Sequence, residues 1–392
     1  MKYTFKIKLQ ILFILFLLAI NFVSSQSNSI ELKGSVVDIR SVPIPYAAIG
    51  IPSKFIGTAT TEDGEFQLSL ENYHISDTLE ISSIGFKTHY ITVQEYINLT
   101  KKIIVLNDDV SELNEVHLLK PKDYVKNAIK NLKSTTIRKP HQLNILYRRF
   151  SVEDGKARFF VEHYLKAVDR GPTSPYFDEI NVIHGRKSAD YRFVKTKQNR
   201  HSAHIMNDLN PLRTRDGFNK YKWKKTGDTT YDGEDVIIIE GTRWKGDYLR
   251  LYIGMDNYAV YKVENSNLNS VFIYKKNIDG KLYLSYHNRE WKNKRKITPE
   301  MQKILGNKKA FVQTAYRHEM FVLGLETDKN KIEYSNNSQI MQDIGDMNVP
   351  YMAIFWSNFS IPPATKFFMK SIKEVESIYG VDIETQFRLV NK

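Results

Sequence analysis

The 392-residue sequence contains no cysteine. Without cysteine there is no disulfide framework, so the fold has to be stabilised by the packing of its core. The same absence excludes thiolate metal ligands, a cysteine nucleophile and lipid attachment through an N-terminal cysteine. Apolar side chains are plentiful, with 42% hydrophobic and 12% aromatic residues, so we expect a folded chain with enough length for two or three domains.

The short motifs that accompany common catalytic sites are also missing. There is no G-x-S-x-G, no H-E-x-x-H, no P-loop and no G-x-G-x-x-G that follows a strand. Each of these motifs supplies a backbone turn or a ligand spacing that its chemistry requires. We therefore predict that the protein is not an enzyme, and we expect no cofactor and no bound metal.

Two histidine-containing segments offer alternatives to this prediction. His201 and His204 have a spacing with which a helix can bind a metal, but surface histidines on a polar loop are the simpler interpretation. His318 and Glu319 lie in a strand pattern, where neighbouring side chains face opposite sides. We do not expect these two to act together as a catalytic pair, because a general base needs its partner on the same face.

A cluster of acidic residues has two interpretations as well. Asp228, Asp232, Glu234 and Asp235 offer the oxygen ligands that calcium prefers. Their spacing is not that of an EF-hand loop, however, and the run YDGED stands where a hairpin needs a polar turn. We favour the turn, because aspartate and glycine tolerate the positive φ that such turns require.

The first 25 residues have the features of a cleavable export signal. Three lysines and no acidic residue precede an apolar run from Leu9 to Ile20. The small residues Ser24 and Ser25 follow this run. The run is shorter than the roughly 20 residues of a membrane-spanning helix, which favours a signal peptide over a retained anchor. We predict a signal peptide at residues 1–25, and therefore a protein that works outside the cytoplasm.

Charge is unevenly distributed along the chain. The formal net charge is +13, yet residues 26–120 carry 7 Lys and Arg against 13 Asp and Glu, whereas residues 121–392 carry 47 against 31. This asymmetry indicates two units of different character. The basic unit can meet an anionic glycan or lipid surface, or its lysines can simply form a solvated exterior. We expect no nucleic acid partner.

Residues 30–106 have the pattern of short strands separated by turns. In residues 66–70 (FQLSL), for example, apolar and polar residues alternate, as in a strand with one buried face. The dipeptide Asp63-Gly64 is a hairpin turn signal. Strands at such even spacing predict a small antiparallel sandwich.

Four blocks of this segment resemble the carboxypeptidase regulatory-like domain, a transthyretin-like β-sandwich. In order they are residues 34–38 (GSVVD), 43–49 (PIPYAAI), 57–66 (GTATTEDGEF) and 77–86 (DTLEISSIGF). This domain stands at the front of many Gram-negative envelope proteins. The resemblance therefore implies a periplasmic or outer-membrane-associated location with envelope proteins as partners. The family has no catalytic residues of its own, so it implies no site residue. We place the domain at residues 26–106.

The remainder of the chain is predicted to contain a helix and then a second, larger β domain. Residues 107–135 form a connector and a helix that opens at Pro121 and places apolar residues at offsets of three and four. Residues 136–392 return to period two, with many Tyr and Phe, and end in a helix closed by Gly380. Successive hairpins predict a large curved antiparallel sheet with a few flanking helices. Its order resembles the half-barrel of bacterial lipoprotein carriers.

Two basic and aromatic runs are the candidate binding residues. Residues 220–225 (KYKWKK) and 289–296 (REWKNKRK) mix lysine or arginine with aromatic rings. Aromatic rings stack on sugars or bases, and lysines pair with anionic groups. We predict ligand binding at Lys222, Trp223, Lys224 and Trp291. The alternative is a strand with its lysines outward and Trp223 in the core.

These features predict a mainly β, non-catalytic exported envelope protein that works as a binding or assembly module. Two other functions stay open. A half-barrel carrier would enclose a hydrophobic ligand in an apolar pocket lined by Tyr and Phe. A glycan-processing enzyme with an accessory sandwich would need two acidic side chains that flank a cleft.

Overall fold

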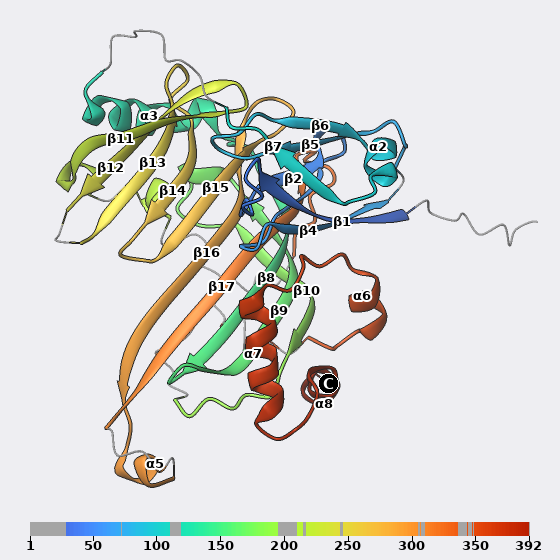
Figure 1. Cartoon of the computed structure of the whole chain (residues 1–392). Helices are drawn as coiled ribbons and strands as arrows, with labels where there is room; N and C mark the ends of the chain where they lie inside the picture. The colour runs from blue at the N-terminus through green and yellow to red at the C-terminus, as the bar shows by residue number, and fades with distance from the viewer. Residues whose placement is uncertain are drawn as a thin grey trace, which may run out of the picture.

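The computed structural model describes residues 29–71, 73–109, 119–194, 210–214, 217–243, 246–304, 306, 310–335, 343, 347 and 349–391. The predicted signal peptide and the pair His201 and His204 lie outside these residues. The described part of the chain is mainly β, with an N-terminal sandwich followed by a large curved sheet (Figure 1). No helix within it is long and apolar enough to cross a membrane.

The sandwich consists of two sheets that enclose one apolar core. Its strands are β1 (Ser29–Asp38), β2 (Ala48–Ile51), β3 (Ile56–Ala59), β4 (Glu65–Glu71), β5 (Thr78–Ser82), β6 (His89–Thr92) and β7 (Ile103–Leu106). One sheet has the order β4-β1-β7, and β3, β2, β5 and β6 form the other. Residues such as Val36, Phe66 and Ile81 fill the space between them, which confirms the predicted sandwich. The expectation of a wholly antiparallel sandwich is wrong in one pair, because β1 and β7 are parallel.

The turn at Asp63-Gly64 differs from the hairpin that we predicted. Gly64 has a φ of 75°, and its N–H donates to the Thr61 carbonyl over 3.0 Å, so a tight turn is present. The strands on either side do not pair, because β3 belongs to one sheet and β4 to the other. The residues of the turn determine that the chain reverses its direction at Asp63-Gly64. Which sheet β3 and β4 each join depends instead on partner strands that are distant in the sequence.

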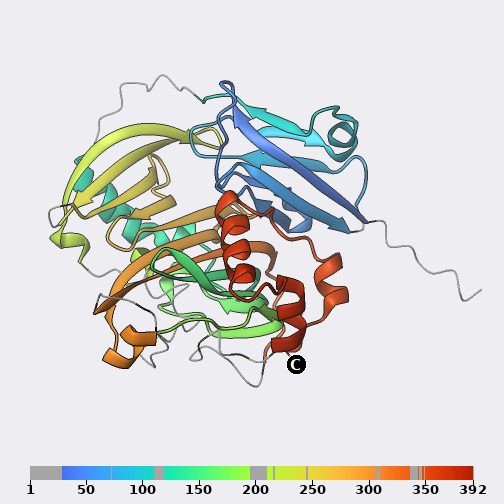
Figure 2. The ribbon, with the colours of Figure 1, turned by 60° about the horizontal axis from the view of Figure 1, so that its bottom comes forward.

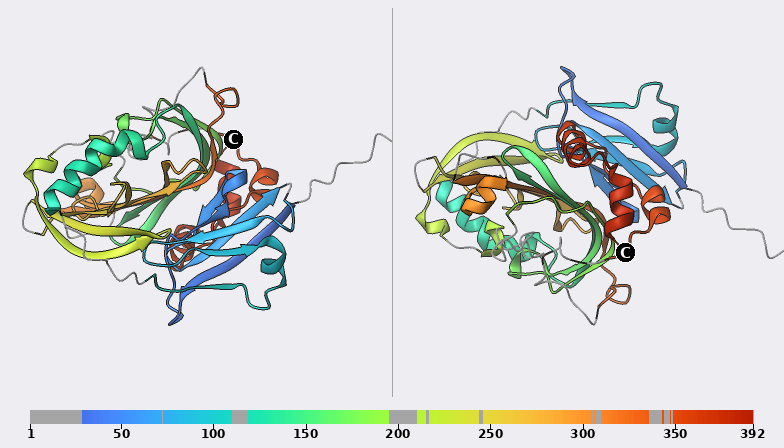
Figure 3. Two further views of the ribbon diagram at one scale, coloured as in Figure 1. Left: turned by 90° about the horizontal axis from the view of Figure 1, so that it is seen from above. Right: turned by 90° about the horizontal axis from the view of Figure 1, so that it is seen from below.

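The larger domain is one continuous antiparallel sheet in the order β11-β12-β13-β14-β15-β16-β17-β8-β9-β10. Its strands are β8 (His141–Glu153), β9 (Lys156–Asp169), β10 (Glu179–Lys187), β11 (Lys222–Tyr231), β12 (Glu234–Thr242), β13 (Tyr248–Gly254), β14 (Val260–Asn265), β15 (Ser270–Lys276), β16 (Leu282–Lys296) and β17 (Phe311–Glu326). The sheet curls into a half-barrel (Figure 3), which confirms the curved sheet predicted from successive hairpins.

Helix α3 (Pro121–Thr135) lies inside the curve. It contacts β11 and β13, and Figure 3 shows it running along these strands. Proline occupies its first turn, as the sequence predicted, since that position needs no N–H partner. Buried Tyr124, Val125 and Leu132 pack against Ile145 and Leu251 of the sheet. The concave face is therefore largely filled by the apolar side of α3.

The convex face is covered by the C-terminal helices and by the sandwich (Figure 2). These helices are α6 (Ala353–Asn358), α7 (Lys366–Ser377) and α8 (Ile383–Val390), and short helices elsewhere are α2 (Val93–Asn98), α4 (Pro211–Thr214), α5 (Pro299–Ile304), η1 (Pro52–Lys54), η2 (Gly171–Thr173) and η5 (Phe218–Lys220). Helix α7 packs on β9, is capped by the Thr365 hydroxyl and is followed by Gly380 at a φ of 67°. The predicted C-terminal helix is thereby confirmed, whereas α6, α8 and β10 were not predicted.

The two domains share one sheet at their junction. Strand β3 reaches β17 through the pair Ile56 and Gly324, and Leu325 N–H donates to the Phe55 carbonyl. A side chain on Gly324 would meet the Asn144 amide nitrogen of β8 at 2.9 Å, so glycine permits the close approach of Asn144 to β17. The limits that we predicted for the domains, 26–106, 107–135 and 136–392, remain predictions.

Candidate functional site

The predicted site residues lie on two separate strands. Lys222, Trp223 and Lys224 belong to β11 at one edge of the sheet, whereas Trp291 belongs to β16, with four strands in between. Lys222 and Lys224 are exposed and Trp223 is half-buried, so the lysines point outward and the tryptophan inward. The two tryptophans do not form a common aromatic face.

Trp223 forms one wall of an apolar groove between β11 and α3. The groove has a volume of about 300 Å³, and Val125 and Ile129 of α3 and Phe218 of η5 also line it. The rings of Trp223 and Phe218 stack at 5.9 Å between centroids, and the indole N–H donates to the Phe218 carbonyl over 2.9 Å. The indole N–H of Trp223 is thus bonded within the protein, while its ring also lines the open groove. Trp223 therefore has features of both a core residue and a ligand contact.

Gly241 allows the indole to lie flat on the sheet. It is the direct cross-strand partner of Trp223, and a side chain there would meet the indole ring at 2.5 Å. A large ring opposite glycine covers the exposed backbone and gains contact area that a smaller residue could not supply. Trp223 therefore owes its position to the strand register.

Basic residues surround the groove. Lys122 and Lys126 of α3, four residues apart and hence on the same side of the helix, line it and are exposed. Lys224 is held away from it by an ion pair with Glu240 at 3.2 Å. Lys122 and Lys126 can therefore meet an anionic group at the mouth of the groove, whereas Lys222 points away from the face that carries Trp223.

A buried ion pair anchors the segment that carries Phe218. Arg213 of α4 forms two hydrogen bonds with the Asp169 carboxylate at the end of β9, of 3.0 and 2.6 Å. Burial alone would raise the pKa of Asp169, but the adjacent Arg213 guanidinium outweighs it and holds the pKa below its usual value. Arg213 also donates to the carbonyls of Gly171 and Ser174. This network positions α4 and, through it, η5 against the barrel.

Trp291 lies on the concave side of β16 and packs against Tyr316, with 5.1 Å between ring centroids. The Arg289 guanidinium sits over its ring at 4.5 Å. Within the described residues Arg289 forms no ion pair, and its Nε atom is buried without a hydrogen-bond partner. Burial lowers the pKa of Arg289 to about 10. Trp291 thus packs on Tyr316 with the Arg289 cation over its ring, and ligand binding at Trp291 remains a prediction.

The acidic turn at Asp232 and the pair His318 and Glu319 have the positions that the sequence predicted. Asp232 and Gly233 occupy the turn of the β11–β12 hairpin with φ values of 54° and 73°, which confirms the turn. His318 packs against His287, and Glu319 lies on the opposite face beside Tyr286. No three His, Asp or Glu side chains converge as a metal site in the described part of the chain.

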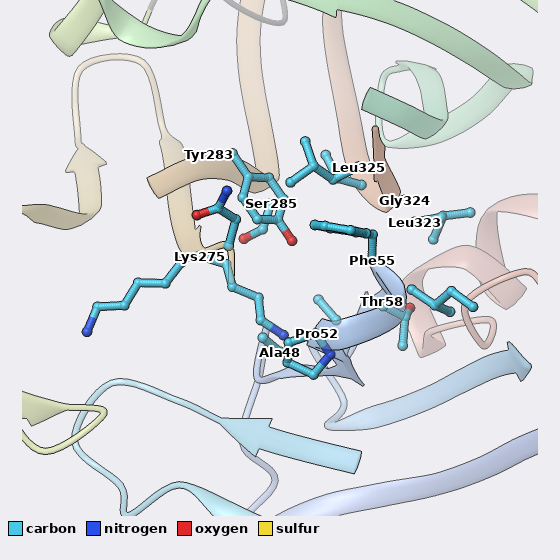
Figure 4. A pocket seen from close by; sticks show the side chains of 16 residues that line it. Ala48, Pro52, Phe55, Thr58, Lys275, Tyr283, Ser285, Leu323, Gly324 and Leu325 are labelled. Carbon is cyan, nitrogen blue, oxygen red and sulfur yellow. The ribbon is translucent and has the colours of Figure 1, made fainter. Parts of the chain in front are cut away.

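A small cavity at the domain junction contains a buried lysine. Lys275 and its cross-strand partner Tyr283 face Pro52 and Phe55 of the sandwich (Figure 4). The cavity measures about 30 Å³, the size of one or two water molecules rather than of an organic ligand. Burial lowers the pKa of Lys275, and the charges of Glu80 and Asp232 oppose this shift without cancelling it.

Replacing Lys275 with methionine is expected to raise the free energy of unfolding at neutral pH by about 1–3 kcal/mol, because a polar side chain whose charged form is disfavoured by burial is removed. Since the folded-state pKa is lowered, the unfolded state binds more protons below the unfolded pKa of about 10.4, and wild-type stability rises with pH toward that value. The gain should therefore shrink in alkaline solution. Urea unfolding at neutral and alkaline pH measures this.

Lys276 provides the control for this substitution. It follows Lys275 in the chain but pairs with Glu234 at 2.9 Å and Asp232 at 3.4 Å. Lys276→Met should leave stability unchanged or lower it slightly. A loss of stability in Lys275→Met would contradict the conclusion that burial disfavours the charged form of Lys275.

Comparison with known proteins agrees with the N-terminal fold. Residues 32–118 match the family model of the CarboxypepD_reg-like domain. The sandwich is therefore a carboxypeptidase regulatory-like domain, as the four sequence blocks predicted. No curated protein matches the chain significantly.

Several solved structures resemble the larger domain at low overall agreement. A putative outer membrane lipoprotein-sorting protein domain from Vibrio parahaemolyticus is 11% identical over 54% of this chain and 94% of its own, with a TM-score of 0.28. A LolA superfamily protein from Nitrosomonas europaea is 14% identical over 56% and 99%, with a TM-score of 0.19. MucB of Pseudomonas aeruginosa, in its complex with MucA, is 7% identical over 53% and 98%, with a TM-score of 0.19. The function of this chain has to be argued from its own geometry.

Proposed function

We propose that this carboxypeptidase regulatory-like domain protein is a non-catalytic envelope protein that binds amphiphiles in the groove between α3 and β11. The apolar chain of the ligand would occupy the groove beside Trp223, and its anionic head group would meet Lys122 and Lys126. The observation that carries the proposal is a groove of about 300 Å³ with an apolar lining and a lysine rim. Ligand sites in proteins combine these two features.

We also propose that the protein is exported and works in the cell envelope. The lysine-rich start and apolar run of residues 1–25 support export, and the regulatory-like domain supports an envelope context. Envelope proteins that hand over or receive the ligand would be the partners. The exposed lysines would attract an anionic lipid surface.

The features of the β11 edge favour an amphiphile as the ligand over a strand that a partner protein adds to the sheet. Among the strands of the described residues, β11 pairs with β12 alone, and near its end the Thr230 carbonyl accepts a hydrogen bond from the Gly85 N–H. Exposed Lys222 and Lys224 and an irregular register between Lys225 and Gly227 blunt this edge. Charges and bulges on edge strands oppose the addition of another strand.

Acidic residues of the chain do not favour the glycan-processing alternative. Glu62, Glu264 and Glu290 line a polar pocket of about 390 Å³, but each pairs with a cation: Arg317, Lys262 and Lys292 respectively. Burial would raise the pKa of Glu264, yet Lys262 and Arg250 hold it below its usual value. An ionised, paired carboxylate cannot supply the proton that glycoside hydrolysis needs.

A fluorescent fatty acid tests the groove directly. Ile129→Lys places a charge on its apolar lining, and we expect the affinity for cis-parinaric acid to fall at least about tenfold, which corresponds to about 1.4 kcal/mol. Ile354→Lys is the matched control, because Ile354 is 77% exposed on α6. Equal binding by wild type and Ile129→Lys, or no binding by wild type, would overturn the proposal.

The head-group contact is tested with two lysolipids. Replacing Lys122 and Lys126 together by glutamine should weaken binding of lysophosphatidylglycerol several-fold and reduce its salt dependence, because exposed charges attract less strongly when screened or removed. Binding of zwitterionic lysophosphatidylcholine should stay unchanged. The matched control replaces Lys130 and Lys133 of the same helix. If both double variants lose the same affinity, the attraction is general rather than local to the groove.

A further inference from the structure

A second cavity lies between the sandwich and the larger domain, on the convex face away from the α3 groove. It has a volume of about 300 Å³, at the lower end of the roughly 300–1,000 Å³ of small-molecule sites. Its walls come from both domains. The sandwich contributes residues 56–58 of β3 and 67–69 of β4, and the larger domain contributes Asn144, Tyr164, Leu323 and residues 358–360.

Among the residues that the structure describes, no charged side chain lines this cavity, although 26% of the sequence is charged. The polar groups that line it are amides and hydroxyls, namely those of Gln67, Asn144, Asn358, Thr58, Ser69, Tyr164 and Ser360. Burial raises the pKa of Tyr164, so its phenol stays neutral and keeps its proton. The cavity therefore offers hydrogen bonds without net charge.

Two of these hydroxyls are buried without a partner. The Oγ1 atom of Thr58 and the Oγ atom of Ser360 form no hydrogen bond within the described part of the chain. Thr58 is only 6% exposed. Leaving a buried hydroxyl unsatisfied costs about 1–3 kcal/mol, so a ligand that supplies hydrogen bonds here recovers that free energy.

Aromatic rings complete the site. Tyr164 and Phe359 pack against each other with 4.8 Å between centroids. Both are only partly buried and line the cavity. Aromatic rings bind the apolar faces of sugar rings, while amides and hydroxyls satisfy the sugar hydroxyls.

From the neutral lining, the unsatisfied hydroxyls and the paired rings, we infer that this junction cavity binds a neutral saccharide. The ligand would contact both domains and thus strengthen their junction. Its affinity should not depend on ionic strength, because no charge in the site is screened. Independence of ionic strength distinguishes the junction cavity from the lysine-rimmed groove between α3 and β11.

Thr58→Val tests the inference without weakening the fold. The substitution keeps the shape of the side chain and removes the unsatisfied hydroxyl, so the melting temperature should stay equal or rise. Affinity for the best binder among maltotetraose, cellotetraose and chitotetraose, measured by calorimetry on the full-length mature chain, should fall at least about tenfold. Thr61→Val is the matched control. Thr61 is also buried with an unpartnered hydroxyl but does not line the cavity. The affinity of Thr61→Val for the saccharide should therefore equal that of wild type.

A second variant and two other ligands complete the test. Asn358→Ala at an exposed position should also weaken saccharide binding. The inference is overturned if none of the three saccharides binds, if Thr61→Val loses as much affinity as Thr58→Val, or if polygalacturonate binds better than every neutral saccharide. Binding of a neutral extended peptide in place of any saccharide would likewise overturn it.

Discussion

Replacing Asp169 with asparagine is expected to lower the free energy of unfolding by about 3–5 kcal/mol, because it leaves the buried Arg213 charge without a counter-ion. Both side chains are almost fully buried, at 1% and 0% exposed. The guanidinium would keep its contacts with two carbonyls but lose the carboxylate. Since α4 precedes the segment that carries Phe218, affinity of the α3 groove should fall as well. Urea unfolding followed by circular dichroism measures the loss of stability.

Asp178 provides the control, because its pair with Arg170 is exposed. Asp178→Asn should change stability by no more than about 1 kcal/mol, as exposed ion pairs contribute little. The double variant Asp169→Leu with Arg213→Met removes both charges, so it should recover most of the stability that Asp169→Asn loses. A loss below about 1 kcal/mol in Asp169→Asn would mean that the buried pair does not hold this segment.

Acidification is expected to destabilise the fold through His287. This residue is fully buried and stacked on Phe272 at 4.1 Å. Its Nδ1–H donates to the Val271 carbonyl over 2.9 Å, and its Nε2 lies 3.2 Å from that of His318. Burial lowers the pKa of His287 from 6.5 to about 3, because the imidazolium form would lose its hydration.

The direction of the effect follows from proton linkage. Between about pH 6.5 and about pH 3 the unfolded chain binds a proton at this histidine that the folded chain does not, so stability falls as pH falls. The contribution is fully present above the unfolded pKa and decreases by at most about 1.4 kcal/mol per pH unit below it. His287→Gln should have a correspondingly shallower acid limb when urea unfolding is measured from about pH 7 to about pH 4.

His74, which is exposed on the sandwich, serves as the control for this titration. His74→Gln should leave the acid limb of wild type unchanged. Identical slopes for wild type and His287→Gln would show that carboxylates alone cause the loss of stability in acid.

Much of the fold could be predicted because it depends on neighbours in the chain. Periods of two and of three to four residues reflect the geometry of strands and helices, so the strands of the sandwich and α3 were found. The alternation in residues 222–224 also supported the alternative interpretation, in which the lysines face outward and Trp223 inward. Helix α8 and strand β10 were missed, although both contain alternating or periodic apolar residues.

The two proposed binding sites could not be predicted in the same way. The groove needs α3 to lie beside β11, and nothing between residues 135 and 222 encodes that distance. The junction cavity joins residues 56–58 with residues 358–360, which are separated by most of the chain. The spacing of Trp223 and Trp291 in the sequence likewise did not reveal the four strands between them.

The sequence by itself determined the β character, the regulatory-like domain, the turns at Asp63-Gly64 and Asp232-Gly233, and the inward position of Trp223. Each of these depends on backbone sterics or on a repeat within a few residues. Tertiary structure alone decided that β3 joins β17, that α3 fills the curve of the sheet, and that neutral side chains from both domains meet at their junction. These choices depend on the sum of many weak contacts between distant segments, which no local pattern contains.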